Sequence, residues 1–260
     1  MYKDLKGYKV LITGGSSGLG LAMAEQLLSE GASVMITARG EERLLAAEAS
    51  LAAKGYDVCS CPMDVTDEAS VAKAAALAEE RFGCLDMVVC DAGIGGNAPA
   101  LKGLAPGYRA LDVPVEAVRQ VVGTNLIGFF TTVKYFVPLM EKQGHGRLLY
   151  VSTSTSTMTR EGQVPYGPSK AGAEAMAMIL SQELKDKGIT VNIICPGGFT
   201  DTAMAPDGAL DFMIKSGRPV LKPTVMNSLI SWLASPDAEG VTGQKFVGKD
   251  FAPPAKIREV

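Results

Sequence analysis

Tyr166 and Lys170 are the residues whose types and spacing most directly suggest chemistry. Residues four positions apart on a helix are neighbours on one face, so this pair predicts a phenol beside an ammonium. A free phenol has a pKa of about 10 and exchanges protons poorly near neutrality. An ammonium about 4 Å away contributes roughly 4 kcal/mol at an effective dielectric of about 20, and this predicts a phenol pKa lower by about three pH units. Such a group suits general acid–base catalysis, which is typically worth about 10²- to 10⁴-fold in rate.

An unbroken run of hydroxyl side chains, Ser152–Thr157, stands shortly before this pair. Successive side chains of a β-strand point to opposite faces, so neighbouring hydroxyls of a strand do not face the same reacting atom. The run therefore predicts either a polar loop or one working hydroxyl among several idle ones, and the pattern alone leaves the choice open.

A glycine-rich turn near the amino terminus, Thr13–Gly20, follows an apolar run and precedes a helical pattern with Leu19, Met23 and Leu27 on one face. Such a turn lets the backbone approach a diphosphate, whose charge is stabilised by free N–H groups and the helix dipole. An ordinary tight turn is the alternative, but strand, turn, helix and a second strand follow in order. The turn predicts nucleotide binding through Gly14, Ser16, Ser17, Gly18, Leu19 and Gly20.

The second predicted strand ends at Ala38 and Arg39, where dinucleotide-binding folds set their choice of cofactor. An acidic residue there hydrogen-bonds the adenosine ribose, whereas an arginine pairs with a 2′-phosphate. Ala38 removes the acid that would repel this phosphate, and Arg39 offers a planar fork of donors. The pair predicts NADP(H), with NAD(H) as the second choice. A solvated loop cation is the alternative interpretation of Arg39.

Short β-branched runs alternate with helical patterns along nearly the whole chain. Strands are expected at 8–13, 33–38, 57–61, 86–90, 147–152, 190–195 and 244–248. Several of these runs are continuously apolar, as strands covered on both faces should be. Residues 67–82 show the apolar spacing of the helices between them. The alternation predicts an α/β fold with a doubly wound parallel sheet, in one domain over residues 1–260.

Composition and charge exclude several classes of function. The chain of 260 residues is 47% hydrophobic and 20% charged, which favours a soluble protein with a sizeable core. The net charge of −3 argues against nucleic-acid binding. No apolar run is long enough for a membrane span, and the first ten residues lack the apolar core of a signal peptide, so a cytoplasmic protein is expected. The five cysteines match no metal spacing and predict reduced thiols, and the single histidine, His145, argues against a metal site.

Taken in order, these motifs resemble the classical short-chain dehydrogenase/reductase family. The resemblance rests on TGGSSGLG (13–20), DVTD (64–67), CDAG (90–93), TNLIG with Asn125, YGPSK (166–170) and the run from Asn192 to Pro196-Gly197. It implies a single-domain Rossmann-type fold with a seven-stranded sheet and helices on both faces. It also implies hydride transfer between a nicotinamide cofactor and a carbonyl or secondary alcohol, in a homotetramer or dimer built on the long helices before residues 142 and 187.

The resemblance implies a role for each residue of the site. Tyr166 would donate the proton during carbonyl reduction, and Lys170 would hold the nicotinamide ribose and lower the tyrosine pKa. Asn125 would kink its helix and anchor a water linked to Lys170. The further cofactor contacts are Asp64 and Val65 at the adenine, Ala92 and Gly93 along the cofactor, and Pro196 and Gly197 against the nicotinamide.

The resemblance also bears on the hydroxyl run. The catalytic serine of the family usually stands thirteen residues before the tyrosine, which counts back from Tyr166 to residue 153. Counting forward from Gly146 without a gap reaches the same residue. Thr153 therefore occupies the serine position, whereas Ser154 would need a bulge or a one-residue deletion.

Some positions depart from the family pattern. Asp91 stands where an asparagine usually braces the central strands, and the threonine that usually follows the proline by five residues is displaced to Thr200 or Thr202. The loop around 99–114 is longer than is usual, and we expect it to border the substrate. Residues 199–221 predict a mobile lid with an apolar inner side, which favours an apolar or mixed substrate.

The sequence thus predicts an NADP(H)-dependent oxidoreductase that reduces a carbonyl to a secondary alcohol or runs the reverse reaction. An NAD-linked alcohol dehydrogenase is the alternative among enzymes. A catalytically silent dinucleotide-binding protein with a regulatory role is the alternative outside them. No metal, nucleic acid or membrane partner is expected.

Overall fold

The protein folds around one seven-stranded sheet in a computed structural model, which describes residues 4–104, 108–205 and 208–253. Residues 105–107 of the predicted substrate loop and 206–207 of the predicted lid lie outside the described part. The strands are β1 Lys9–Thr13, β2 Ser33–Ala38, β3 Val58–Pro62, β4 Met87–Cys90, β5 Gly146–Val151, β6 Ile189–Cys195 and β7 Lys245–Val247. Each lies within one residue of its predicted bounds.

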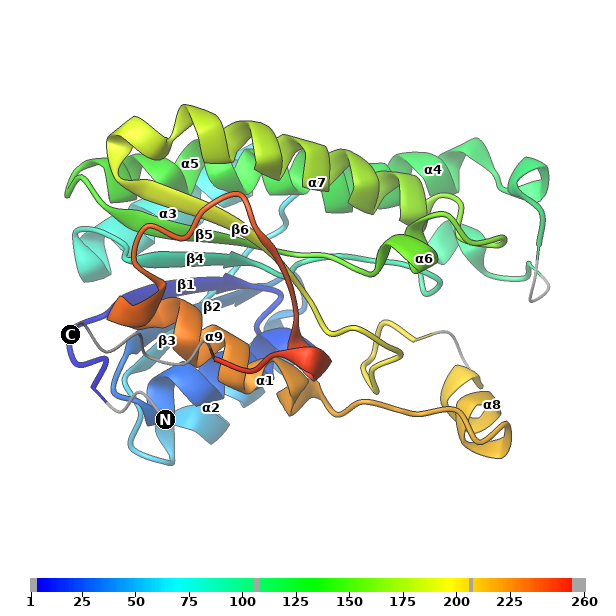
Figure 1. Ribbon diagram of the computed structural model, residues 1–260, viewed down its shortest axis with the longest axis horizontal. Helices are drawn as coiled ribbons and strands as arrows, with labels where there is room; N and C mark the ends of the chain where they lie inside the picture. Colours follow the sequence, from blue (N-terminus) through cyan, green and yellow to red (C-terminus); the bar gives the residue numbers. More distant parts are fainter. Residues whose placement is uncertain (1–3, 105–107, 206–207, 254–260) are drawn as a thin grey trace, which may run out of the picture.

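The strand order is β3-β2-β1-β4-β5-β6-β7, and every neighbouring pair is parallel. The chain builds outward from β1 to β3, crosses back to β4, and builds outward again to β7 (Figure 1). This confirms the predicted doubly wound sheet of Rossmann type. The strand order reverses between β1 and β4, and ligands of such sheets bind beyond the carboxyl ends of the strands at that point.

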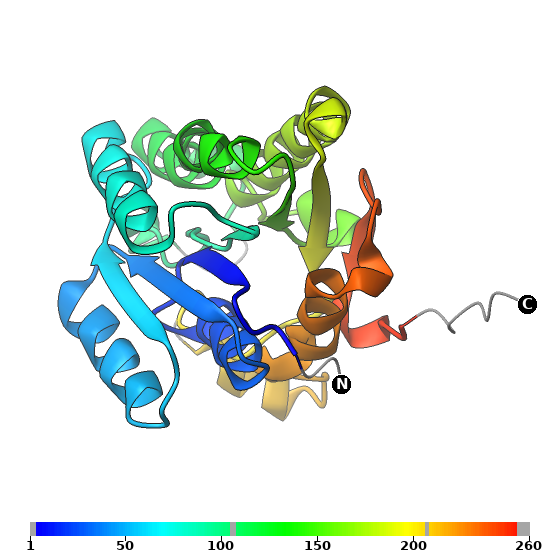
Figure 2. The same ribbon diagram turned by 90° about the vertical axis from the view of Figure 1, so that its left-hand side faces the viewer.

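Helices cover both faces of the sheet (Figure 2). The α-helices are α1 Gly18–Ser29, α2 Glu41–Ala52, α3 Glu68–Phe82, α4 Val115–Val122, α5 Gly128–Glu141, α6 Thr155–Met158, α7 Tyr166–Glu183, α8 Ala209–Lys215 and α9 Asn227–Ala234. The short 3₁₀ helices are η1 Pro99–Leu101, η2 Ala110–Asp112, η4 Lys185–Lys187, η5 Pro223–Met226, η6 Pro236–Ala238 and η7 Gly248–Asp250. A π-helical segment, η3 Gly123–Ile127, joins α4 to α5. Helices α3, α5 and α7 form one layer, and α1, α2 and α9 form the other.

Helix α3 shows how the sequence sets these elements. Asp67 caps its first turn by accepting a hydrogen bond from the Ala69 N–H at 3.0 Å, and Gly83 ends it with φ at 75°. Val71 and Ala78, which recur at helical spacing, are fully buried against the sheet. The predicted helix over 67–82 is confirmed. Its apolar stripe packs it against the sheet in the layer that it forms with α5 and α7.

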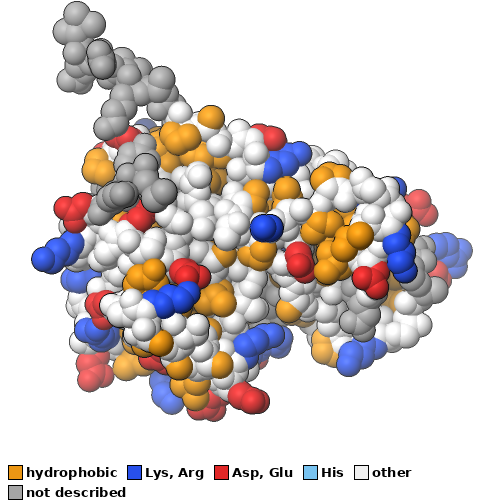
Figure 3. Space-filling model, turned by 90° about the horizontal axis from the view of Figure 1, so that it is seen from below, with side chains coloured by type: hydrophobic (Ala, Val, Ile, Leu, Met, Phe, Trp, Pro, Cys, Tyr) orange, Lys and Arg blue, Asp and Glu red, His pale blue; other side chains and the backbone are white. Residues whose placement is uncertain are grey.

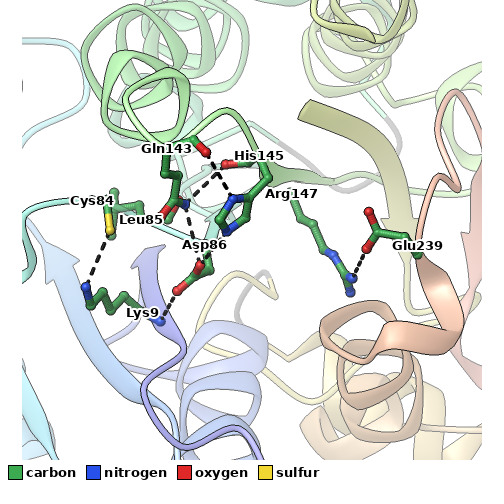
Figure 4. A network of polar contacts seen from close by, with 8 residues as sticks. All are labelled: Lys9, Cys84, Leu85, Asp86, Gln143, His145, Arg147 and Glu239. Carbon is green, nitrogen blue, oxygen red and sulfur yellow. Dashed lines mark hydrogen bonds and ion pairs between the residues drawn. The ribbon is translucent and has the colours of Figure 1, made fainter. Parts of the chain in front are cut away.

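A polar network ties together the amino-terminal ends of the central strands (Figure 4). Asp86 accepts hydrogen bonds from the Lys9 backbone N–H at 2.7 Å and lies 3.1 Å from His145 Nε2. Arg147 pairs with Glu239 at 3.1 Å. The His145 side chain is 59% exposed. This edge is opposite the carboxyl ends of the strands, so the single histidine is a surface residue remote from the predicted site.

The described part of the chain contains no helix that is long and apolar enough to cross a membrane. Nor do these residues contain a group of three or more histidine, cysteine or acidic side chains placed to hold a metal. All five cysteines are free thiols, and Cys61, Cys90 and Cys195 are buried.

Candidate active site

The glycine-rich turn is packed too tightly for any other residue type at two of its positions. Gly14 has φ at 74°, and a Cβ there would lie 3.0 Å from the Ala92 nitrogen. A Cβ on Gly20 would lie 2.7 Å from the Gly14 carbonyl oxygen. Ser17 precedes α1 without capping it through its side chain. The turn thus brings bare backbone and the positive end of α1 to the surface, which fits a diphosphate.

The second half of the predicted cofactor site follows β2 and β3. Arg39 is exposed at the end of β2, next to the half-buried Ala38, and has no hydrogen bond or ion pair within the described residues. Asp64 is engaged locally, because its Oδ1 accepts hydrogen bonds from the N–H and hydroxyl of Thr66 at 2.9 and 2.7 Å. The Val65 side chain is buried against Gly128. Val65 therefore offers a ligand its backbone only.

Lys170 is buried one helical turn after Tyr166 on α7, and is 3% exposed. Its Nζ donates a hydrogen bond to the Val151 carbonyl at 2.8 Å and lies 5.8 Å from the centre of the Tyr166 ring. The ring of Tyr150 is closer, at 5.0 Å from Nζ. The predicted pair does share one helix face at the carboxyl end of β5. Its ammonium, however, is held by the strand rather than by the phenol.

The predicted lowering of the tyrosine pKa is wrong. Burial raises the pKa of Tyr166 to about 12, and the nearby Asp91 and Cys195 add to this rise. The Thr153 side chain, which lies near the phenol, opposes this rise. The Lys170 ammonium, which donates its hydrogen bond to the strand, does not offset the loss of water around the ring. Tyr166 therefore carries its proton at neutral pH.

The structure separates the two hydroxyls that compete for the serine position. Thr153 follows the end of β5 and meets the Tyr166 phenol. Ser154 is the N-cap of α6, and its Oγ accepts the Thr157 N–H at 3.2 Å and lies 3.0 Å from Ser156 Oγ. Its hydroxyl is occupied within its own helix. The geometry thus favours Thr153, in agreement with the predicted register.

Asn125 lies in the π-helical segment η3 and is 1% exposed. Its side chain forms a two-way bridge to Ile94: Nδ2 donates to the carbonyl and Oδ1 accepts the N–H, both at 2.9 Å. Nδ2 also donates to Ser169 Oγ at 2.9 Å, and Ser169 donates to the Tyr166 carbonyl at 2.7 Å. The expected break in the helix is thus a π-helical turn. From this turn, the Asn125 side chain joins the loop after β4 to the start of α7.

Asp91 lies between the glycine-rich turn and the buried lysine. Its carboxylate accepts the Gly20 N–H, and Thr13 Oγ1 accepts the Asp91 N–H at 3.1 Å. Burial raises the pKa of Asp91 to about 7, although Lys170 opposes the rise. Burial lowers the pKa of Lys170 to about 8, and Asp91 is the largest influence against this. The departure from asparagine thus places a buried carboxyl close enough to Lys170 to affect its pKa.

The remaining predicted cofactor contacts line the same end of the sheet. A Cβ on Gly93 would lie 3.1 Å from Asn125 Oδ1 and 3.5 Å from Lys170 Nζ. Pro196 is half-buried beyond β6, and its carbonyl accepts the Lys249 N–H at 3.1 Å. Gly197 next to it has φ at 89°. The structure brings these residues together with Tyr166 and Lys170.

The segment after β6 lies over this end of the sheet. Its Met204 lies beside Gly93 and Gly95, where an added Cβ would come within 3.6 and 3.7 Å of it, and its Thr202 lies beside Gly18 of the glycine-rich turn. The Asn97 amide of the loop after β4 donates to the Ala203 carbonyl at 3.3 Å. Helix α8 of the same segment exposes Phe212 and Ile214, and hydrophobic side chains gather on parts of the face seen from below (Figure 3). The start of the loop after β4, which precedes the predicted 99–114 segment, thus lies against the predicted lid beside Tyr166.

Sequence reasoning missed two residues of the site. Ser169, quoted within the YGPSK motif, links Asn125 to the Tyr166 carbonyl. Gly95 allows the loop after β4 to approach the Tyr166 ring, since a Cβ there would lie 3.3 Å from it. The helical spacing of Ser169 from Tyr166 was a usable signal, whereas the approach at Gly95 depends on the path of the loop.

The sequence of the chain is similar to those of known proteins. The sequence profile described as short chain dehydrogenase matches residues 8–209. The 2,5-dichloro-2,5-cyclohexadiene-1,4-diol dehydrogenase LinX of Sphingobium indicum is 33% identical over 251 residues, which cover 94% of this chain and 95% of the relative. The 3-oxoacyl-acyl-carrier-protein reductase MabA of Mycobacterium tuberculosis is 31% identical over 241 residues, or 90% of this chain and 88% of the relative.

Solved structures share the fold of the chain at somewhat lower sequence identity. A crystal structure of an actinorhodin polyketide ketoreductase variant with NADPH matches with a TM-score of 0.81 and 29% identity, covering 94% of this chain and 98% of that one. The crystal structure of levodione reductase matches with a TM-score of 0.81 and 26% identity, covering 93% and 96%. The seven-stranded sheet, the glycine-rich turn and the matching profile lead to one conclusion: the chain belongs to the short-chain dehydrogenase/reductase family of oxidoreductases.

Proposed function

We propose that the protein is an NADP(H)-dependent reductase that converts a ketone into a secondary alcohol. The observation that carries the proposal is the meeting of Thr153, Tyr166 and Lys170 at the carboxyl end of β5, beside the glycine-rich turn. A bound nicotinamide would supply the hydride. The exposed Arg39 after β2 supports the phosphorylated cofactor, because its guanidinium can donate hydrogen bonds to the 2′-phosphate. Ala38 stands where an acidic residue would repel that phosphate.

The chain's own residues account for the proton. Tyr166 keeps its proton at neutral pH, so the phenol has a proton to deliver to the oxygen of a ketone as that oxygen gains charge, although its raised pKa makes it a weaker acid than a free phenol. The Thr153 hydroxyl stabilises the same oxygen by donating a hydrogen bond. Lys170 supplies positive charge and donors for a ribose, and Asn125 fixes the loop and helix that frame the phenol.

The test is turnover of a ketone panel that includes acetoacetyl-CoA and cyclohexanone, followed by the absorbance of NADPH. Tyr166→Phe keeps the ring and removes the proton, so we expect turnover to be nearly lost while NADPH binding is retained. Tyr56→Phe, at a half-buried tyrosine outside the site, is the matched control. Substantial ketone reduction by the Tyr166 variant would show that another group delivers the proton.

Oxidation of an alcohol with NAD is the second candidate, and the similarity to the diol dehydrogenase LinX favours it. Titration of the protein with NAD and NADP in parallel separates the two candidates. The position of Met204 beside Gly93 and Gly95 supports an apolar or mixed substrate, because this side chain lies beside the phenol.

We also propose that the protein forms a homo-oligomer through α5 and α7. Phe130 of α5 and Ile179 of α7 are 50% and 53% exposed, and Met178 is 40% exposed. Apolar side chains gathered on neighbouring helices are typical of subunit contacts. Light scattering after size exclusion gives the mass. Phe130→Glu should reduce it to that of a monomer, and an unchanged mass would exclude this face.

A further inference from the structure

A mostly buried carboxylate on α7 has no role in the site described so far. Glu174 follows Lys170 by one helical turn, and its side chain is 18% exposed. Its Oε1 accepts hydrogen bonds from Ser152 Oγ at 2.5 Å and from Lys245 Nζ at 2.6 Å. A buried carboxylate is costly unless it is paired and hydrogen-bonded, so these two donors explain how the charge is tolerated between helix and sheet.

Ser152, one of the two donors, belongs to the peptide unit that holds the catalytic lysine. Its side chain is buried, and its N–H donates to the Ile194 carbonyl on β6 at 2.7 Å. The carbonyl of the same peptide unit, that of Val151, accepts the hydrogen bond from Lys170 Nζ. A trans peptide is planar, so its N–H and C=O point in opposite directions and rotate together. A rotation of this unit would therefore displace the lysine.

The same unit also directs the catalytic hydroxyl. Thr153 follows Ser152 directly and meets the Tyr166 phenol, after which the chain turns into α6. The last regular pairing of β5 with β6 is that of Val151 with Ile194. Beyond it, the Ser152 N–H and hydroxyl are the bonds that fix the chain before Thr153.

We propose that Glu174 is a positioning residue, which fixes the peptide between Val151 and Ser152 and through it the places of Lys170 and Thr153. The proposal rests on the proposed function, since these places matter only if both residues act in the reaction. Lys245 keeps the carboxylate in place from the first residue of β7. The contact thus spans α7, β5 and β7.

In this proposal, Glu174 has to provide a hydrogen-bond acceptor within reach of the Ser152 hydroxyl. Glu174→Gln keeps an acceptor oxygen of the same reach for Ser152, whereas Glu174→Ala removes it and leaves a buried hydroxyl without a partner. Ser152→Ala removes the donor with the loss of one oxygen, and leaves the core volume nearly unchanged. Glu183→Gln, an exposed position on the same helix, is the matched control.

The kinetic test uses the full-length protein, NADPH and the ketone of the panel that is reduced fastest. Displacements of about 1 Å in a catalytic group can cost about 10²-fold, and we expect about a tenfold loss of kcat in Glu174→Ala and in Ser152→Ala. The double variant should lose no more than either single one, because both remove the same contact. Glu174→Gln should recover most of the loss, with KM for the ketone little changed throughout.

Hydrogen exchange tests the contact independently of activity. The Ser152 amide should exchange faster in Glu174→Ala than in the unchanged protein, in peptides that cover residues 148–156, and Glu183→Gln should leave it unchanged. Unaltered exchange would overturn the proposal, and so would altered exchange with an unaltered kcat or additive losses in the double variant. A protein that reduces no ketone at all contradicts the proposed function instead, and the exchange rates still decide whether Glu174 fixes this peptide.

Discussion

Asp91→Asn should stabilise the protein at alkaline pH and leave its stability nearly unchanged at acidic pH. Burial raises the pKa of the Asp91 carboxyl from its ordinary value of 3.8 to about 7, despite the attraction of Lys170. One pH unit corresponds to about 1.4 kcal/mol, so this difference is worth at most about 4 kcal/mol. Asparagine has nearly the same shape and keeps an acceptor for the Gly20 N–H, but carries no charge.

The sign follows from which state holds the proton more tightly. Because the pKa is raised in the folded protein, the unfolded chain loses its proton first as the pH rises. The contribution of Asp91 to stability is fully present below pH 3.8 and is lost as the pH rises to about 7. The free energy of unfolding of Asp91→Asn should therefore exceed that of the unchanged protein by less than about 1 kcal/mol near pH 4, and by up to about 4 kcal/mol near pH 8.

Urea unfolding measures this difference through the fluorescence of Trp232, the single tryptophan. This residue of α9 is 3% exposed. Both proteins are compared at one protein concentration at the two pH values, with the exposed Asp186→Asn as the matched control. A gain of equal size at both pH values would refute the reasoning, and so would a loss of stability at the higher one.

Three further predictions concern the candidate site. Thr153→Val should lower kcat by about 10²- to 10³-fold, because it removes a donor to developing negative charge, and Ser154→Ala should lower it far less; kinetics at saturating NADPH compare them, and the reverse order would contradict the register. Ala38→Asp combined with Arg39→Gln should shift the preference from NADP to NAD in parallel titrations, a result excluded if the unchanged protein already binds NAD as tightly. Gly167→Ala would place a Cβ 2.0 Å from a carbonyl oxygen of α6; it should lower both the melting temperature and kcat, and an unaffected melting temperature would show that α6 moves aside freely.

The sheet was predictable because its strands follow a simple physical pattern. Runs such as VLI (10–12) and MVVC (87–90) are apolar throughout, which is typical of strands covered on both faces. The glycine-rich turn was predictable for a related reason. Gly14 and Gly20 are required where backbone meets backbone, and this requirement is visible as residue type.

The electrostatics of the site were not predictable in the same way. The spacing of Tyr166 and Lys170 places them on one helix face, but it does not show which acceptor the lysine chooses. That choice depends on the path of β5, whose last carbonyl takes the ammonium. The opposite shift of the Tyr166 pKa depends on burial by several segments distant in sequence. The spacing of the two residues along the chain determines neither the acceptor of Lys170 nor the burial of Tyr166.

The wide turn of η3 has a consequence for how the chain length between α4 and α5 can change over evolutionary time. A π-helical turn is rarer and less favourable than an α-helical one, so deleting one residue of Gly123–Ile127 would restore better backbone bonding locally. The same deletion would rotate the whole of α5 by about 100°. Phe136, now fully buried, would then leave the core, or Asn125 would leave Ile94. Substitutions can therefore accumulate along this segment one at a time, but its length is expected to stay the same. A deletion of one residue would disrupt either the packing of the core or the geometry of the site.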